Sequence, residues 1–598
     1  MFKLFKNLSK KAYSYIFLSI VFIVLQVILD LKIPDYMTNI TSLVQTGGMV
    51  KDILKQGIYM LFCALGSLIG SIIVCYLATY LASFFGQKTR KKIYEKVLNF
   101  SMEDIKDFSV SSLITRTTND VGQIQMLISF GLQALIKAPI MAVMAILKIA
   151  GKNIKFSMLV FIAVVLLLIV IVIIISLVIP RFKLVQKLTD NLNRITRENL
   201  TGIRVIRAFN AEKYQTDKFN ETNNKLTNTQ LFNQRVMGVM APFMSLIMSS
   251  LTLGIYFVGA TLIESAMIAD KLVIFSDMVV FSTYAMQIIM SFMMLVVIFL
   301  IYPRASVSAK RINEVLDREN KIKSGKLVSS KEIGTVEFKN VSFKYPDADD
   351  YMIKNVSFKA NKGDTIAFIG GTGSGKSTLI NLIPRFYDVT EGEVLVDGVN
   401  VKNYKLEYLH EKLGYVAQKA FMFRGSVKDN INYGESSKIS LDNLDDALKV
   451  SQSYEFVSKM DKGVDSFIAR GGTNVSGGQK QRLGVARAIV RKPEIYIFDD
   501  TFSALDYQTD YRLRHDLKEY TKDATTLIVA QRIGTILEAD KIIVLDNGCV
   551  VGMGTHQELL KNCSVYQEIA KSQLGSEELK WEENIKIWKN LRILKNQF

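Results

Sequence analysis

The first half of the chain alternates long apolar runs with polar segments, whereas the second half has the mixed pattern of a water-soluble domain. A helix needs about 20 apolar residues to cross a bilayer. Lipid-spanning segments must satisfy their own backbone hydrogen bonds, and runs of this length indicate helices rather than barrel strands. The pattern therefore predicts six transmembrane helices, at about 15–33, 57–85, 128–149, 157–179, 237–263 and 278–302.

Two long polar segments separate these runs, at 86–126 and 180–236. Their apolar residues recur at helical spacing, which predicts helices that continue well beyond the membrane. Each pair of helices must then turn, and we expect the turns near 103–116 and 202–211. We interpret both turns as docking sites on the soluble domain, because a domain tethered only to the last span could not move the others. Ordinary loops are the alternative.

Charge supports a membrane protein with its soluble domain in the cytoplasm. The formal net charge is +18, and Lys and Arg gather beside the apolar runs, as expected of cytoplasmic flanks. There is no basic stripe interleaved with aromatic residues, so we expect no nucleic-acid partner. Lys3, Lys6, Lys10 and Lys11 precede the first run. We interpret that run as a retained helix with a cytoplasmic N-terminus, and an even number of spans returns the chain to the cytoplasm.

The spans themselves suggest an apolar or amphipathic cargo. Methionine and aromatic residues crowd the fifth and sixth runs, either as a soft binding surface or as ordinary helix packing. Lys137 and Lys148 lie in the third run, where both are expected to extend toward an interface. No acidic partner for them is evident in the sequence. A small transported ion is therefore disfavoured.

A phosphate-binding loop opens the chemistry of the second half. An apolar strand at 365–369 leads directly into a glycine-rich loop that ends where a helix begins. Such a loop surrounds phosphates with backbone N–H groups, and the helix N-terminus adds a favourable dipole. Lys376 is expected to reach the β- and γ-phosphates, and Ser377 to ligate Mg²⁺. The loop consists of Gly370, Gly371, Thr372, Gly373, Ser374, Gly375, Lys376, Ser377 and Thr378.

About a hundred residues later, Ser476, Gly477, Gly478 and Gln479 precede another helix, and an apolar strand then ends at Asp499. This combination and order resemble the ATP-binding cassette (ABC) family in its exporter form, over nearly the whole chain. The resemblance implies that Tyr345 stacks on adenine and that Asp499 binds Mg²⁺. It further implies that Gln418 contacts Mg²⁺ and the membrane domain, and that Asp506 lies in a loop crossing to a second cassette.

The expected fold is an α-helical membrane domain with long cytoplasmic extensions, fused to an α/β P-loop ATPase. We expect the membrane domain at 1–316, a linker at 317–333, the ATP-binding domain at 334–573 and a tail at 574–598. The tail carries Trp581 and Trp588 on one helical face, which suits a membrane-surface helix, a helix packed on the cassette or a disordered end. In the family, two cassettes enclose two ATP molecules head to tail. One cassette with six spans therefore implies a half-transporter that dimerises in the membrane.

Two residues depart from the family pattern. Asp500 stands where Glu is usual, and Gln531 stands where His is usual. Hydrolysis needs a carboxylate that orients the attacking water. Asp is one methylene shorter, and a displacement of about 1 Å can cost about 100-fold in rate. Gln531 donates a hydrogen bond but carries no proton or charge near neutral pH. Both departures fall in one composite ATP site, which we expect to bind ATP and hydrolyse it poorly.

The intact Ser476–Gln479 signature belongs to the other composite site of a dimer. A homodimer would have two weak sites, whereas a different partner would restore one by supplying Glu and His with its own P-loop. The pattern resembles the degenerate subunit of bacterial heterodimeric multidrug exporters. We therefore predict ATP-driven export of hydrophobic or amphipathic compounds across the cell membrane. A lipid or peptide exporter, and an ATP-gated channel or sensor, are the alternatives.

Overall fold

The structure is a computed structural model that describes residues 3, 10–150, 153–434 and 441–573. The chain divides into two compact units. The first contains Met1–Leu98 and Ser109–Arg318, and the second contains Asn99–Phe108 and Glu319–Phe598. The predicted tail at 574–598 lies outside the described residues, as does most of the basic segment before Lys10.

Long helices make up the first unit. Within the described residues, six helical stretches are long and apolar enough to cross a membrane, which confirms the predicted number. The longest helices have 49 residues, or about 74 Å at 1.5 Å per residue, more than twice the thickness of a hydrocarbon core. The predicted extensions beyond the membrane are thus present. The spans lie in α2 (Lys10–Gln45), α3 (Val50–Leu98), α6 (Val121–Ala150), α7 (Ile154–Thr201), α10 (Met240–Ser265) and α11 (Ile268–Leu316).

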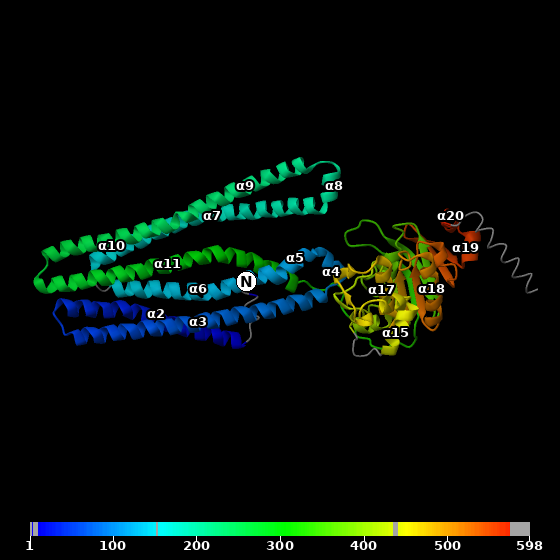
Figure 1. The fold of residues 1–598 in the computed structure, drawn as a ribbon, viewed down its shortest axis with the longest axis horizontal. Coiled ribbons are helices and arrows are strands. Elements are labelled where there is room, and N and C mark those ends of the chain that lie inside the picture. Colours follow the sequence, from blue (N-terminus) through cyan, green and yellow to red (C-terminus); the bar gives the residue numbers. More distant parts are fainter. Residues whose placement is uncertain (1–2, 4–9, 151–152, 435–440, 574–598) are drawn as a thin grey trace, which may run out of the picture. The chain divides into compact units, whose positions relative to one another are not determined.

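Helices α2, α3, α6 and α11 lie side by side in Figure 1. Their shared interior contains large side chains such as Ile23 of α2, and Phe281 and Tyr284 of α11. Helix α10 joins the same core through Met240 and Met244. On α11, by contrast, Met286 and Met290 are exposed. Methionine side chains of this unit therefore lie both in its core and on its surface.

The extension of α7 returns along α9 (Glu212–Gly238), and the short helix α8 (Ile203–Ala208) joins them (Figure 1). Gly202 ends α7, and its N–H bonds back to the carbonyl of Glu198. Helix α8 has no buried residue, and the apolar side chains of Val205 and Phe209 are 61% and 78% exposed. The predicted second turn therefore presents an uncovered apolar surface.

The expectation that the lysines of the third span lack acidic partners is wrong. Lys137 Nζ lies 3.1 Å from Asp30 Oδ2, and Lys148 Nζ lies 2.6 Å from Asp35 Oδ2. Both pairs join α6 to α2. The acids sit at the end of the first apolar run, more than a hundred residues earlier in the chain, so that only helix packing brings the charges together.

The second unit contains two larger sheets. An antiparallel sheet has the order β2 (Ile353–Ala360), β1 (Val336–Phe343), β4 (Glu391–Val396) and β5 (Val399–Asn400). In the six-stranded sheet, all neighbours pair in parallel except β12 and β11. Its order is β12 (Cys549–Gly554), β11 (Lys541–Asp546), β3 (Thr365–Gly370), β10 (Thr525–Val529), β9 (Ile495–Asp499) and β6 (Leu413–Val416).

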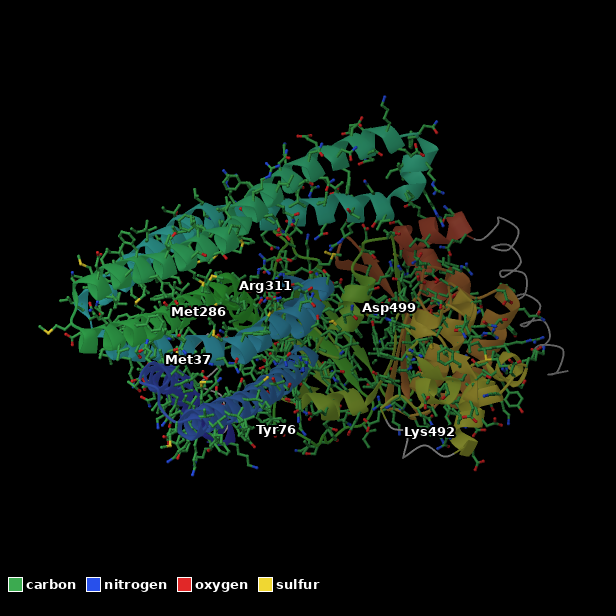
Figure 2. The ribbon with its side chains drawn as sticks, turned by 60° about the vertical axis from the view of Figure 1, so that its left-hand side comes forward. Met37, Tyr76, Met286, Arg311, Lys492 and Asp499 are labelled. Atoms are coloured by element: carbon green, nitrogen blue, oxygen red, sulfur yellow. The ribbon has the colours of Figure 1, made fainter. Side chains whose placement is uncertain are left out.

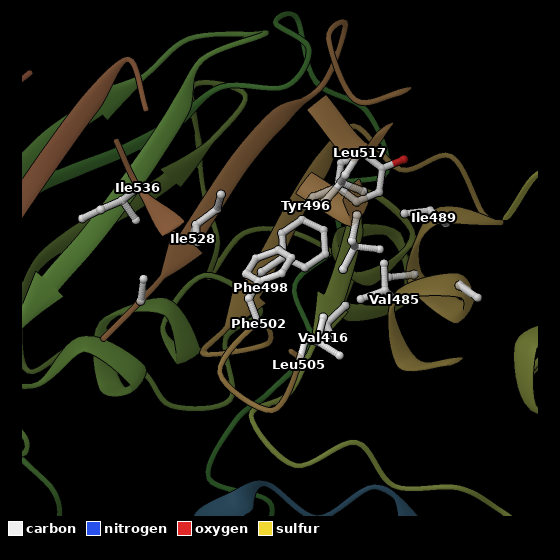
Figure 3. Close-up of a cluster of buried hydrophobic side chains, with 14 of the residues drawn as sticks. Val416, Val485, Ile489, Tyr496, Phe498, Phe502, Leu505, Leu517, Ile528 and Ile536 are labelled. Atoms are coloured by element: carbon white, nitrogen blue, oxygen red, sulfur yellow. The ribbon is translucent and has the colours of Figure 1, made fainter. Parts of the chain in front are cut away.

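Two cores hold this unit together. In Figure 3, Tyr496 and Phe498 of β9 pack with Val485 and Ile489 of α17 (Gly477–Ile489). A second cluster joins the two larger sheets, and includes Phe338 and Phe368 together with residues of the helix that follows the P-loop. The strands are hydrophobic on both faces, as is usual for a parallel sheet with both faces covered. This packing fixes the strand ends on which the functional residues sit.

Helix α4 (Met102–Asp107) groups with the second unit, although the chain around it belongs to the first. Ser101 caps the helix in a reciprocal arrangement with Asp104. Asn320 Nδ2 donates to the carbonyl of Asn99 at 2.8 Å, and Lys321 pairs with Glu103. The predicted turn at 103–116 is thus divided, since α5 (Val110–Thr115) belongs to the first unit.

Candidate functional site

The carboxyl ends of β3, β10, β9 and β6 meet at one edge of the parallel sheet. In open α/β sheets, ligands bind outside this edge. The P-loop follows β3, Gln531 follows β10, Asp499 and Asp500 follow β9, and Gln418 follows β6. Figure 2 locates Asp499 within this unit. The sheet order therefore gathers residues that are far apart in the sequence.

Lys376 begins α12 (Lys376–Asn381) directly after the loop. Its Nζ donates 2.8 Å hydrogen bonds to the carbonyls of Gly370 and Gly371, so that the side chain folds back over the loop. Burial lowers the pKa of Lys376, and the charges of Asp500 and Asp499 oppose this shift. A buried ammonium held above a loop of N–H groups suits a phosphate chain.

Two of the loop glycines are required by geometry. At Gly370 a Cβ would come within 2.0 Å of the carbonyl oxygen of Leu545. Gly375 has a φ of 96°, and a Cβ there would meet Ile353 Cδ1 at 2.6 Å. Larger residues would displace the loop from the sheet. Thr372 and Gly373 are exposed at the tip of the loop, where a ligand has access to them.

Ser377 and Asp499 offer a pair of oxygen donors beside the loop. Ser377 Oγ donates to Asp499 Oδ1 at 2.8 Å. Burial raises the pKa of Asp499, whereas the hydrogen bond from Ser377 opposes this shift. A hydroxyl and a carboxylate fit Mg²⁺, which takes few protein ligands and keeps several waters. Elsewhere in the described part of the chain, no cluster of three or more His, Cys, Asp or Glu residues offers a metal site.

The carboxylate of Asp500 is held by two amides. Gln531 Nε2 donates to Asp500 Oδ2 at 2.7 Å, and Gln418 Nε2 donates to the same oxygen at 3.1 Å. The backbone of Asp500 is left-handed, with φ at 47°, and Ser503 Oγ donates to its carbonyl. The side-chain oxygen Asp500 Oδ2 thus accepts hydrogen bonds from two protein amides. The predicted contact of Gln418 with Mg²⁺ stays a prediction, since its amide contacts Asp500 here.

Gln573 is a site residue that the sequence reading missed. Its Nε2 donates to the carbonyl of Gln531 at 2.7 Å, and its Oε1 accepts from the N–H of Ile533 at 2.9 Å. It ends α20 (Ser564–Gln573), the last described helix. These two bonds fix the backbone that carries Gln531. No motif marks Gln573, because its role depends on where α20 packs.

The signature residues and Asp506 begin other helices. Ser476 caps α17, where Ser476 Oγ accepts from the N–H of Gln479 and Gln479 Oε1 accepts from the N–H of Ser476. Ser476 and Gly477 are exposed. Asp506 caps α18 (Tyr507–Tyr520), and the N–H of Thr509 lowers the pKa of its carboxylate. The exposed start of α17 offers backbone donors to an anion on another molecule.

Tyr345, the predicted adenine contact, lies in an aromatic cluster with Phe343 and Tyr387. Its hydroxyl is 3.0 Å from Thr378 Oγ1 of the P-loop helix. Lys106 of α4 places its Nζ 4.7 Å from the centre of the Tyr345 ring. An ammonium at this distance makes a cation–π contact. Tyr345 thus adjoins the segment 99–108 within the same unit, and its contact with adenine stays a prediction.

Two family descriptions match the chain. Residues 16–292 match the family described as the ABC transporter transmembrane region, and residues 353–503 match the family described as ABC transporter. The second match includes the P-loop, the signature and both Asp499 and Asp500.

Several curated proteins are similar along most of their length. An uncharacterized ABC transporter ATP-binding protein of Mycobacterium tuberculosis is 37% identical over 82% of this chain and 84% of its own length. The uncharacterized YfiB of Bacillus subtilis is 36% identical over 82% and 85%. An ATP-dependent lipid A-core flippase of Escherichia coli is 32% identical over 66% and 68%.

A solved structure of a bacterial Atm1-family ABC exporter with ATP bound has the same fold. Its TM-score is 0.80 over 94% of this chain and 99% of that chain, at 21% identity. This likeness confirms the predicted fold class, six membrane helices fused to a P-loop ATPase domain. Together with the identity to the curated relatives, these matches establish that the chain belongs to the ABC transporter family.

Proposed function

We propose that this chain is the ATP-retaining half of a heterodimeric exporter of hydrophobic or amphipathic compounds. The observation that carries the proposal is the pair of amide hydrogen bonds on Asp500 Oδ2, donated by Gln418 and Gln531. A general base must have an oxygen free to accept the proton of the attacking water. Here Asp500 Oδ2 accepts from two amides, which orient the short carboxylate toward Gln418 and Gln531.

The groups that would bind ATP are separate from this amide-bound carboxylate. Neither the Gln418 amide nor the Gln531 amide changes its charge near neutral pH. The phosphate loop, Lys376 and the oxygen pair of Ser377 and Asp499 are intact beside this carboxylate. Those groups would hold ATP with Mg²⁺ at this site. Binding and hydrolysis are thereby separated in one cassette.

The signature supports a partner of different sequence. Ser476 and Gly477 are exposed at the start of α17, where they are accessible to a nucleotide held by another chain. That nucleotide would lie on the partner's own P-loop, beside a Glu and a His that the partner supplies. The uncovered side chains of Val205 and Phe209 near α8 are the proposed docking surface for a cassette.

In the proposed cycle, ATP on Lys376 keeps the two cassettes engaged while the partner's site turns over. Closure and opening of the cassettes reach the spans through α4 and α8. Lys106 joins α4 to Tyr345, and so connects the adenine-binding region to this path. An even number of spans places the cassette and the N-terminus on the same side of the membrane, and the basic flanks of the spans make that side the cytoplasm in this proposal.

The cargo is proposed to be of the multidrug type, and lipid export is the second candidate. The relative from Escherichia coli is described as a lipid A-core flippase, and the first unit contains ion pairs suited to a polar headgroup. A peptide exporter remains an alternative cargo class, and an ATP-gated channel or sensor an alternative activity.

Purification of the tagged chain from its native membranes tests the proposal. We expect it to carry a second ABC half-transporter with Glu and His at the positions of Asp500 and Gln531. The chain alone, expressed without that partner, should hydrolyse ATP at least about 100-fold more slowly than the pair, since both of its sites would be weak. Brisk hydrolysis by the isolated chain would refute the division of labour.

A further inference from the structure

The membrane unit contains a line of charged and polar groups where α2 meets α3, α6 and α11. Asp30 pairs with Lys137, accepts from Ser67 Oγ on α3, and its carbonyl accepts from Gln287 Nε2 on α11. The second pair, Asp35 with Lys148, lies about 7.5 Å further along α2 at 1.5 Å per residue. Tyr284 Oη donates to Asp35 Oδ1 at 2.8 Å and to the carbonyl of Leu31 at 3.0 Å. We call the two pairs Asp30–Lys137 and Asp35–Lys148 the α2 ion pairs.

The Asp30–Lys137 pair is shielded but still accessible. The side chain of Lys137 is 24% exposed and that of Asp30 is 19% exposed. Beside them, Gln287 Oε1 has no hydrogen-bond partner within the described residues. Ionisable groups in a membrane span are costly and are commonly retained for function. A purely structural contact between α2 and α6 would need no charges here.

We propose that the α2 ion pairs form a binding site for the headgroup of a zwitterionic amphiphile, with an ammonium and a phosphate on one molecule. A ligand with a single charge would take one member of a pair and leave the other unpaired in a poorly hydrated place, which is strongly unfavourable. A zwitterion replaces both partners at once. Its ammonium meets Asp30, and its phosphate meets Lys137.

Two exposed methionines of α11 suit the hydrocarbon chain of such a ligand. Met286, labelled in Figure 2, lies next to Gln287 on α11, and Met290 follows one turn later. Both are more than half exposed. Unbranched thioether side chains adapt to chains of different shape. The inference rests on the proposed export of amphipathic compounds and narrows that class to zwitterions.

Equilibrium binding to the purified full chain, in dodecyl maltoside and without nucleotide, tests the site. The probes share an 18-carbon chain and differ in headgroup: oleoyl-lysophosphatidylethanolamine, oleoyl-lysophosphatidylglycerol, oleylamine and monoolein. We expect the zwitterion to bind at least about 10-fold more tightly than the anionic, cationic and neutral probes. Phosphoethanolamine without a chain should bind at least about 100-fold more weakly than the lysolipid, because it buries no hydrocarbon.

The double variant Asp30→Asn with Lys137→Met removes both charges at similar volume. Neutral replacement of a buried pair usually leaves stability little changed, so the fold should persist. The preference for the zwitterion should fall below about 3-fold. The matched control is the double variant Glu221→Gln with Lys225→Met, which removes an exposed ion pair on α9. This variant should keep the preference for the zwitterion. Lys137→Arg, which keeps the charge, should also keep it and provides a second test should the double variant fail to fold.

Equal binding of all four probes, or a preference that survives in the double variant, would overturn the headgroup site. Binding of none of the four would instead contradict the proposed cargo class as a whole. The hydrolysis experiments on Asp500 and the signature do not depend on either result, so that the two proposals fail separately.

Discussion

Gly477→Asp in this chain should lower ATP turnover of the assembled transporter by at least about 100-fold. The added carboxylate would repel the phosphate from the start of α17 and so weaken the contact of its N–H donors with the partner's ATP. Loss of one fixed donor to a developing charge costs about 100- to 1000-fold. The fold should tolerate the change, because a Cβ at Gly477 meets nothing within 4 Å and Asp is favourable at a helix N-terminus. Steady-state phosphate release by the purified heterodimer measures the effect.

The companion variant Asp500→Asn addresses the other composite site. It should change turnover of the pair by less than about threefold, because the carboxylate it removes is already engaged by Gln418 and Gln531. Gly477→Asn, which adds volume without charge, should fall between the two. If Asp500→Asn abolished turnover while Gly477→Asp spared it, the assignment of the two sites would be reversed.

Asp500→Glu combined with Gln531→His should raise hydrolysis at this chain's own site by at least about 100-fold. The longer carboxylate reaches the position of the attacking water, and the loss of the Gln531 amide removes the 2.7 Å bond to Asp500 Oδ2. Either substitution alone should give much less, since Gln531 would still engage a Glu, and a His would still face a short carboxylate.

The measurement is a single-turnover assay on a heterodimer whose partner carries Gln in place of its catalytic Glu. Only the site built on Lys376 then hydrolyses ATP. Gln573→Ala offers a separate check on positioning, because Gln573 holds the backbone of Gln531 by two hydrogen bonds. A double variant as slow as the unaltered chain would show that Asp500 and Gln531 do not limit this site.

Much of this architecture could be predicted from local patterns. The apolar strand predicted to end at Asp499 is present as β9 (Ile495–Asp499) and ends at that residue. Five of the six apolar runs fall within single long helices, and the run at 237–263 begins at the end of α9 and continues in α10. Both signals are strong because each depends on neighbouring residues: a buried strand is apolar throughout, and a span needs about 20 apolar positions. The P-loop is similarly local, since its glycines and lysine lie within seven consecutive residues.

What the sequence did not reveal depends on packing between distant segments. Asp30 and Lys137 are more than a hundred residues apart and meet only because α2 packs on α6. Gln573 reaches Gln531 from the last described helix, and Lys106 reaches Tyr345 from a short helix far upstream. The substitutions at Asp500 and Gln531 were visible in the sequence. The hydrogen bond between Gln531 and Asp500, which couples the two substitutions, was not visible in the sequence.

The most direct measurement of the central claim identifies the nucleotide bound to each subunit after turnover. The heterodimer would be cycled with an adenine-labelled, photo-crosslinkable ATP, irradiated, and separated into its two chains. We expect unhydrolysed ATP on this chain, at the site of Lys376, and ADP on the partner. Equal amounts of ADP on both chains would contradict it.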